Sequence, residues 1–132
     1  MRDFTFYTST PLTAKKCFDN LNSEIKNIRG SSDPDEIQIS IAGKSRSYLW
    51  FYNERFEDYT EFYETPEEME EEKMLMPIES PYMNHFETHR SIDAKRVIKV
   101  LMNIYPELYI SADDSPEWYG SAQEYLDTEF DY

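Results

Sequence analysis

The pattern of apolar and polar residues in Ser91–Ile110 predicts a helix that leads through a proline turn into a strand. The apolar residues of this segment, among them Val97 and Leu101, recur at three- and four-residue spacing, as on one buried helix face. Pro106 cannot continue a helix, and the apolar run Leu108–Ile110 behind it favours a strand. The pattern therefore predicts a helix with Ser91 as its N-cap, one proline turn and then a strand.

A second amphipathic helix is predicted near the N-terminus. Thr10 followed by Pro11 is typical of a helix start, because the hydroxyl caps the helix and proline presets φ at its first position. An apolar face then continues to Ile28, and Gly30 suits the C-terminal cap. Cys17 lies on that face, so we expect it to be a small buried hydrophobe and not a nucleophile.

Strands are predicted where apolar and polar residues alternate with a period of two. These segments are Asp3–Thr8, Tyr82–His89 and the two arms of a hairpin, Ile37–Ile41 and Ser47–Tyr52. The period in Phe56–Tyr63 does not decide between strand and helix.

Two capping boxes mark further short helices, since a Ser or Thr three residues before a Glu satisfies helix N-terminal donors. Thr65–Glu68 begins an acidic helix that we expect to reach about Met74, and Ser121–Glu124 begins a last one. Ala112–Gly120 is predicted to be a loop.

The predicted order is strand, helix, hairpin, acidic insertion, strand, helix, strand and acidic C-terminal tail. Two long amphipathic helices on one face of a mainly antiparallel sheet give an α+β fold, close to a split βαβ or ferredoxin-like arrangement. The 132 residues show no break in composition, so we expect a single domain over residues 1–132.

Charge narrows the choice of partner. The chain has 27 acidic and 13 basic residues, a formal net charge of −14. Glu54–Arg90 holds 12 acidic and 3 basic residues, and Glu107–Tyr132 holds 8 acidic residues and no basic one. Nucleic acid and anionic membranes are therefore poor partners, because phosphate contacts need Lys and Arg. A basic macromolecule is therefore the better candidate partner.

The single cysteine and the lack of a leader or an 18-residue apolar run predict a soluble cytoplasmic protein.

The sequence offers little for catalysis. His85, Glu87 and His89 share one side of a predicted strand, a spacing that can hold a metal, although a plain polar surface is the simpler interpretation. They match neither the helical His-Glu-x-x-His motif nor the zinc deaminase signature. The carboxylates mostly stand in solvated runs, and no glycine-rich phosphate loop is present. We therefore predict a non-enzymatic protein without a metal or cofactor.

Aromatic residues inside the acidic blocks favour a binding function instead. The chain has 11 Tyr, 8 Phe and 2 Trp, more than so small a core needs. Tyr and Trp dominate binding hot spots, and carboxylates around them steer a basic partner. The alternative is that the rings close the sheet and the acids only solubilise. The predicted partner-binding residues are Glu57, Asp58, Glu61, Asp113, Asp114 and Glu117 for charge pairing, and Tyr59, Tyr63, Trp118 and Tyr119 as anchors.

Three segments also carry a likeness to a known class: Pro81–Arg90, Ser91–Ile110 and the closing Asp113–Leu126. In them the chain resembles the small acidic immunity proteins that bacteria make against toxins of contact-dependent and polymorphic toxin systems. The resemblance implies a cytoplasmic, tight, non-enzymatic inhibitor of one basic cognate toxin, such as a nuclease. Two alternatives stay open: a phage-type nucleic-acid mimic that inhibits a host defence enzyme, and a small metal-binding enzyme built on the two histidines and Glu87.

Overall fold

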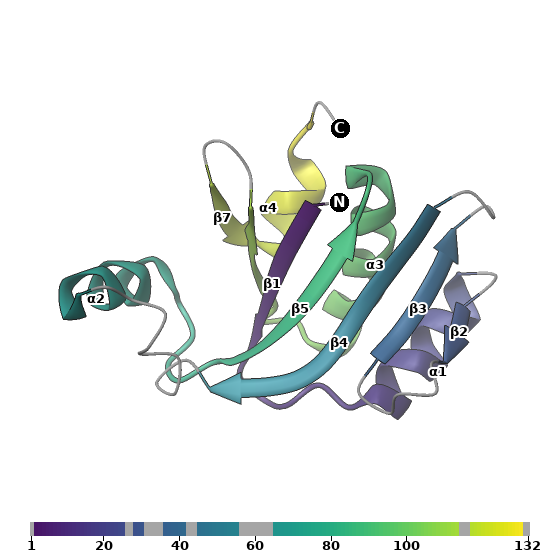
Figure 1. Cartoon of the computed structure of the whole chain (residues 1–132), viewed down its shortest axis with the longest axis horizontal. Helices are drawn as coiled ribbons and strands as arrows, with labels where there is room; N and C mark the ends of the chain where they lie inside the picture. The colour runs from purple at the N-terminus through teal and green to yellow at the C-terminus, as the bar shows by residue number, and fades with distance from the viewer. Residues whose placement is uncertain are drawn as a thin grey trace.

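The computed structural model describes residues 2–25, 28–30, 36–41, 45–55, 65–113 and 117–130. Within them, seven strands form one sheet in the order β2-β3-β4-β5-β1-β6-β7 (Figure 1). The strands are β1 (Arg2–Thr8), β2 (Ile28–Gly30), β3 (Glu36–Ile41), β4 (Ser45–Arg55), β5 (Tyr82–Thr88), β6 (Tyr109–Ala112) and β7 (Trp118–Ser121). The helices are α1 (Ala14–Glu24), α2 (Pro66–Leu75), α3 (Ser91–Ile104) and α4 (Ala122–Asp127). Each pair of neighbouring strands is antiparallel, which confirms the predicted α+β class and the antiparallel sheet.

Strand β1 is an interior strand of the sheet, between β5 and β6. Its register sets Phe4 opposite both Phe86 of β5 and Ala112 of β6. The ring of Phe86 lies 5.9 Å from that of Phe4 and 5.4 Å from that of Phe6, measured between centroids. All three rings are buried, because strand alternation turns them toward the helices.

Helices α1, α3 and α4 lie together on one face of the sheet (Figure 1). Val97, Ile98 and Leu101 of α3 and Cys17 and Leu21 of α1 are fully buried and join the sheet residues in one core. Helix α3 begins at Ser91 and ends before the proline turn, so the apolar spacing predicted this element correctly. Within the described residues, no helix has both the length and the apolar character needed to cross a membrane.

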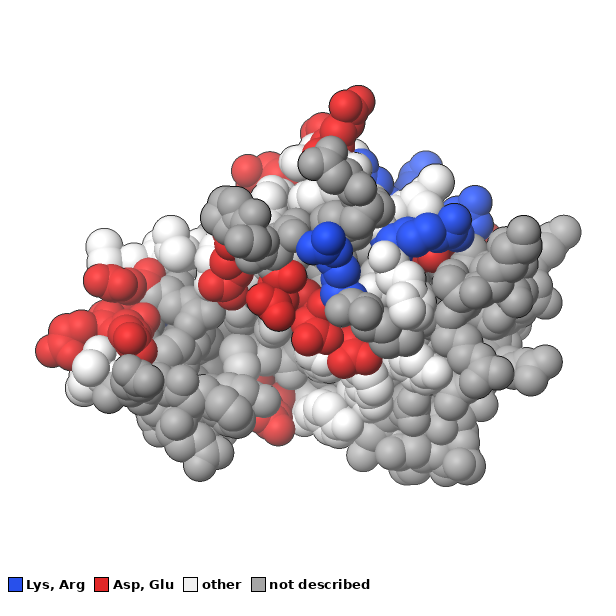
Figure 2. All heavy atoms as spheres, turned by 45° about the horizontal axis from the view of Figure 1, so that its top comes forward, with Lys and Arg blue, Asp and Glu red and all other residues white. Residues whose placement is uncertain are grey.

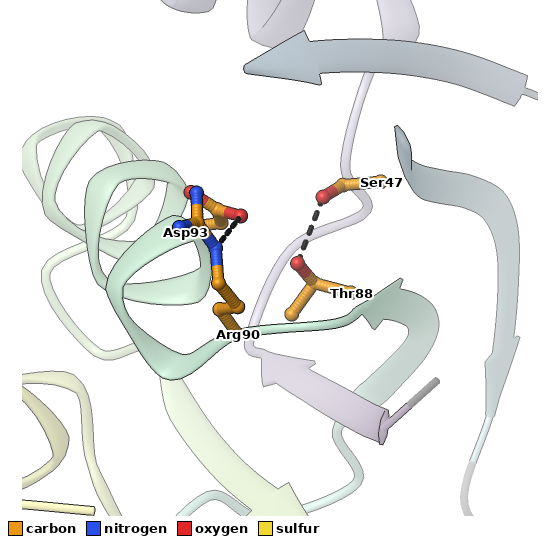
Figure 3. A network of polar contacts seen from close by, with 4 residues as sticks. All are labelled: Ser47, Thr88, Arg90 and Asp93. Carbon is orange, nitrogen blue, oxygen red and sulfur yellow. Dashed lines mark hydrogen bonds and ion pairs between the residues drawn. The ribbon is translucent and has the colours of Figure 1, made fainter. Parts of the chain in front are cut away.

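The junction between β5 and α3 is fixed by polar side chains (Figure 3). Ser91 was predicted to be the N-cap, but it is the first helical residue, and Arg90 occupies the cap position without a side-chain cap bond. Instead, the Arg90 guanidinium donates to both carboxylate oxygens of Asp93, each at 3.3 Å. Asp93 is only 1% exposed, and its charge suits the positive end of the helix dipole. Beside it, the buried Ser47 hydroxyl donates to Thr88 Oγ1 at 2.8 Å.

Helix α1 is shorter than predicted at both ends. It begins at Ala14, with Thr13 in the cap position, and ends at Glu24. The late start follows from Asn53, whose side chain accepts from the Leu12 N–H at 2.8 Å and donates to the Leu12 carbonyl at 2.9 Å. The backbone of Leu12 is thus bound to β4 and not to a helix. The prediction that Gly30 caps this helix is wrong, because Gly30 pairs with Ile37 in β2.

The short elements follow their capping residues. Thr65 Oγ1 accepts from Glu68 N–H at 3.3 Å at the start of α2, and the complete capping box of Ser121 and Glu124 begins α4. Strand β7 was predicted to be loop, but it pairs with β6. Helix α2 projects beside the sheet (Figure 1).

The reactivity of the buried Cys17 thiol reports how firmly α1 packs against the core. Burial, the largest cause, raises the pKa of its thiol to about 12, although a hydrogen bond with Tyr105 and the charge of Lys16 act in the opposite direction. The thiolate is the reactive form, so the folded protein should resist Ellman's reagent at pH 8 and react only when it is unfolded in concentrated guanidinium chloride. Rapid labelling of the native protein would show that the helix opens readily.

Candidate functional site

In the described part of the chain, helices α1, α3 and α4 all lie on one face of the sheet and leave its opposite face uncovered by a helix packed flat against it (Figure 1). Among the described residues, its apolar cover is the segment after α2, where Met76 and Ile78 pack with Tyr7, Met83 and Tyr109. Elsewhere, strand alternation turns side chains of β1, β4 and β5 away from the core and toward this face. We call this region the open face.

Three rings form a stacked row on the open face. Tyr48 and Trp50 of β4 are stacked with centroids 5.7 Å apart, and Trp50 is stacked on His85 of β5 at 5.2 Å. The β4–β5 register accounts for this, because it pairs Trp50 directly with His85. All three residues are partly exposed. We call Tyr48, Trp50 and His85 the aromatic row.

Carboxylates lie along one side of the aromatic row. Glu87 is the cross-strand partner of both Tyr48 and Asp3. Asp113 directly follows β6 and continues the line, since its backbone N–H donates to the Asp3 carbonyl at 2.9 Å and its side chain is exposed. Over β1, β5 and β6, the strand positions on this face carry no Lys or Arg. We call Asp3, Glu87 and Asp113 the acidic row.

Two members of the acidic row meet the imidazole. His85 Nε2 lies 3.4 Å from Glu87 Oε1 and 3.6 Å from Asp3 Oδ1. One donor atom from each of the three side chains lies within 4.8 Å of the other two, so the group could hold a metal ion. The sequence analysis considered His85, Glu87 and His89 for this role and preferred a polar surface without a metal. The structure brings Asp3 to the first two, and His89 follows β5 as an exposed residue.

A cavity of about 160 Å³ adjoins this group, lined by Thr5, Tyr52, Met83, Asn84 and His85. It is smaller than the roughly 300–1,000 Å³ of sites that enclose drug-sized ligands. The cavity therefore suits a small ligand or one side chain of a partner better than a large organic cofactor.

Charged side chains are unevenly spread over the surface. Figure 2 shows acidic groups at the left, over α2, and again near the centre, while Lys and Arg gather to the right of centre. The acids of α2 include Glu67, Glu70 and Glu71, all exposed. They form a second acidic surface with which the open face can be compared.

Only some of the predicted partner-binding residues lie in the described part of the chain. Glu57, Asp58, Tyr59, Glu61 and Tyr63 lie outside the described residues, as does Asp114. Of the described ones, Asp113 belongs to the acidic row and Glu117 is exposed.

Trp118 and Tyr119 lie on opposite faces of β7. The Trp118 ring is partly buried on the helix side, 5.2 Å from Tyr125 and 6.0 Å from Phe130. It also covers Gly120, where an added Cβ would lie 2.5 Å from the ring. Tyr119 pairs with Ser111 and therefore shares the open face. Trp118 is packed within the protein, which makes it a weaker anchor than Tyr119.

Sequence reasoning missed Asp3, Tyr48 and Trp50 as site residues. A signal for the two rings was present, because Tyr48, Trp50 and Tyr52 alternate with apolar Leu49 and Phe51 in a predicted strand. For Asp3, the contact depends on the pairing of β1 with β5, which local spacing does not reveal.

Comparisons with protein families, with characterised proteins and with solved structures find no match to this chain.

Proposed function

We propose that this chain is a non-enzymatic binding protein that receives a basic segment of a partner protein on its open face. The observation that carries the proposal is the aromatic row lying directly beside the acidic row, on a face that α1, α3 and α4 leave open. Together these features suit a partner that presents Arg or Lys.

The chemistry of the two rows is complementary to guanidinium and ammonium groups. A cation over an indole or phenol face gains about 0.5–2 kcal/mol, and Trp is the best acceptor. Trp50 and Tyr48 are partly exposed rings beside the carboxylates of Asp3 and Glu87, which supply the charges for pairing. The net charge of −14 adds long-range attraction that speeds encounter at low salt.

The resemblance to immunity proteins supports a narrower form of this proposal, in which the partner is a basic toxin domain that the chain neutralises in the cytoplasm. We also propose that α1 and α3 with β4, β5, β1 and β6 form the split βαβ core of a ferredoxin-like fold. The order of these four strands and the placement of each helix in the chain support that assignment.

A fluorescent nona-arginine peptide is a suitable probe, titrated in EDTA so that no metal contributes. We expect saturable binding that weakens as salt rises, and a roughly tenfold loss of affinity in Trp50→Ala, which is the scale of one hot-spot ring. Anisotropy gives the affinity.

A charge-matched pair of variants separates the open face from bulk charge. Asp3→Asn/Glu87→Gln/Asp113→Asn removes three carboxylates from the acidic row, and Glu67→Gln/Glu70→Gln/Glu71→Gln removes three from α2. The first should weaken peptide binding by roughly tenfold or more, and the second should have a much smaller effect. Equal losses in both variants, or no loss in Trp50→Ala, would refute this docking surface.

A further inference from the structure

We propose that Asp3, His85 and Glu87 form a Zn²⁺ site with three protein ligands. The donor atoms are one carboxylate oxygen of Asp3, Nε2 of His85 and one carboxylate oxygen of Glu87. The site shares these three side chains with the open face proposed above to receive a basic segment, so a bound zinc ion and that segment would compete for them.

Two of the three separations between donor atoms are close to those around a tetrahedral ion, and the third is below 4.8 Å. Zinc binds His nitrogen at about 2.0–2.1 Å and carboxylate oxygen at about 2.0–2.2 Å, so two donors on a tetrahedron lie about 3.4 Å apart. His85 Nε2 is 3.4 Å from Glu87 Oε1 and 3.6 Å from Asp3 Oδ1. Both separations exceed the 2.7–3.2 Å of a well-formed hydrogen bond. His85 and Glu87 make a long hydrogen bond at 3.4 Å, and an ion bound between them would replace this contact with ligand bonds to both side chains.

The backbone holds the three ligands from two neighbouring strands. Asp3 and Glu87 are cross-strand partners, and His85 stands two residues before Glu87 on the same face. Trp50 stacks on the imidazole at 5.2 Å with an interplanar angle of 27°, which limits its rotation. Much of the ligand geometry is thus set by the fold, and that reduces the ordering cost of binding.

The donor set selects among divalent ions. An imidazole nitrogen disfavours Ca²⁺ and Mg²⁺, which take oxygen ligands, whereas zinc accepts one nitrogen and two carboxylates. Two carboxylates neutralise the ion, and Asp113 adds negative charge nearby. The cavity that His85 also lines provides room for a water or a small anionic ligand in the fourth position.

The test is a zinc titration of the full chain after EDTA treatment and buffer exchange, followed by calorimetry. We expect one zinc ion per chain, unaffected by excess Mg²⁺. Co²⁺ should bind in its place and give visible absorption bands typical of tetrahedral coordination. Trp50 fluorescence should change on binding, because the indole is stacked on a ligand.

The chain supplies a matched control, since it has only two histidines. His85→Ala should weaken zinc binding by more than the roughly 10–100-fold that loss of an outer partner costs, and His89→Ala should leave it unchanged. His85→Gln keeps the side-chain size and should show the same loss, with an unchanged circular dichroism spectrum. Equal affinity in the two alanine variants, or no saturable site in the native chain, would overturn the proposal.

The two proposals can fail separately. Zinc binding is measured without peptide, and peptide binding is measured in EDTA. Tyr48→Ala should weaken nona-arginine binding and leave zinc binding unchanged, because Tyr48 contacts Trp50 and supplies no ligand atom. Loss of zinc binding in Tyr48→Ala would contradict the ligand set.

Discussion

Phe86→Ala should lower the free energy of unfolding by about 3–5 kcal/mol, the range for removal of a buried aromatic ring. Phe86 is fully buried on the helix side of β5 and contacts the rings of Phe4 and Phe6. Its loss leaves a cavity between the middle strands and α3, which the rigid sheet closes poorly. Urea denaturation followed by circular dichroism measures the change.

Phe86→Leu is the control for this variant, because it keeps most of the apolar volume and should cost much less. A loss below about 1 kcal/mol in the alanine variant would show that the cavity collapses, and would contradict the central position assigned to this ring.

Asn53→Ala should lower the free energy of unfolding by about 2–4 kcal/mol. Its side chain makes two hydrogen bonds to the Leu12 backbone and accepts a third from Asn84 Nδ2 at 2.9 Å. Each such bond contributes about 0.5–1.5 kcal/mol. The residue also has φ of 47°, a left-handed conformation that costs alanine about 1–2 kcal/mol. Chemical denaturation again gives the value.

Asn53→Gly separates these two causes. Glycine adopts positive φ without strain, so this variant loses the hydrogen bonds only and should be about 1 kcal/mol more stable than the alanine variant. If both variants unfold like the native protein, the link between Leu12 and β4 contributes nothing to stability.

The sequence predicted correctly those elements whose position depends on residues inside the element itself. The apolar spacing of α3 and the capping residues of α2 and α4 gave the positions of these helices. The patterns failed for α1 and β7. The start of α1 depends on Asn53, which is distant in sequence, and β7 forms because β6 offers a free edge.

The candidate site was predicted only in part, for the same reason. Alternation in β5 correctly put His85 and Glu87 on one side, and the acidic C-terminal segment pointed to Asp113. The residues that complete the site around His85 and Glu87 are Asp3 and Trp50, which lie on the neighbouring strands β1 and β4. Only the register of the sheet brings them together. Trp118 was predicted to be a binding anchor because acidic residues surround it in the sequence. In the structure its ring packs over Gly120 instead.

The interior position of β1 in the sheet also affects how the chain folds. The β3–β4 hairpin joins strands that are adjacent in the chain, so it can close soon after it is made. In contrast, β1 pairs with strands that are distant in sequence: Thr8 with Tyr82, and Phe4 with both Phe86 and Ala112. During synthesis, the apolar side chains of β1 therefore stay unpaired until nearly the whole described chain has been made. Folding should therefore be limited by the closure of these long loops.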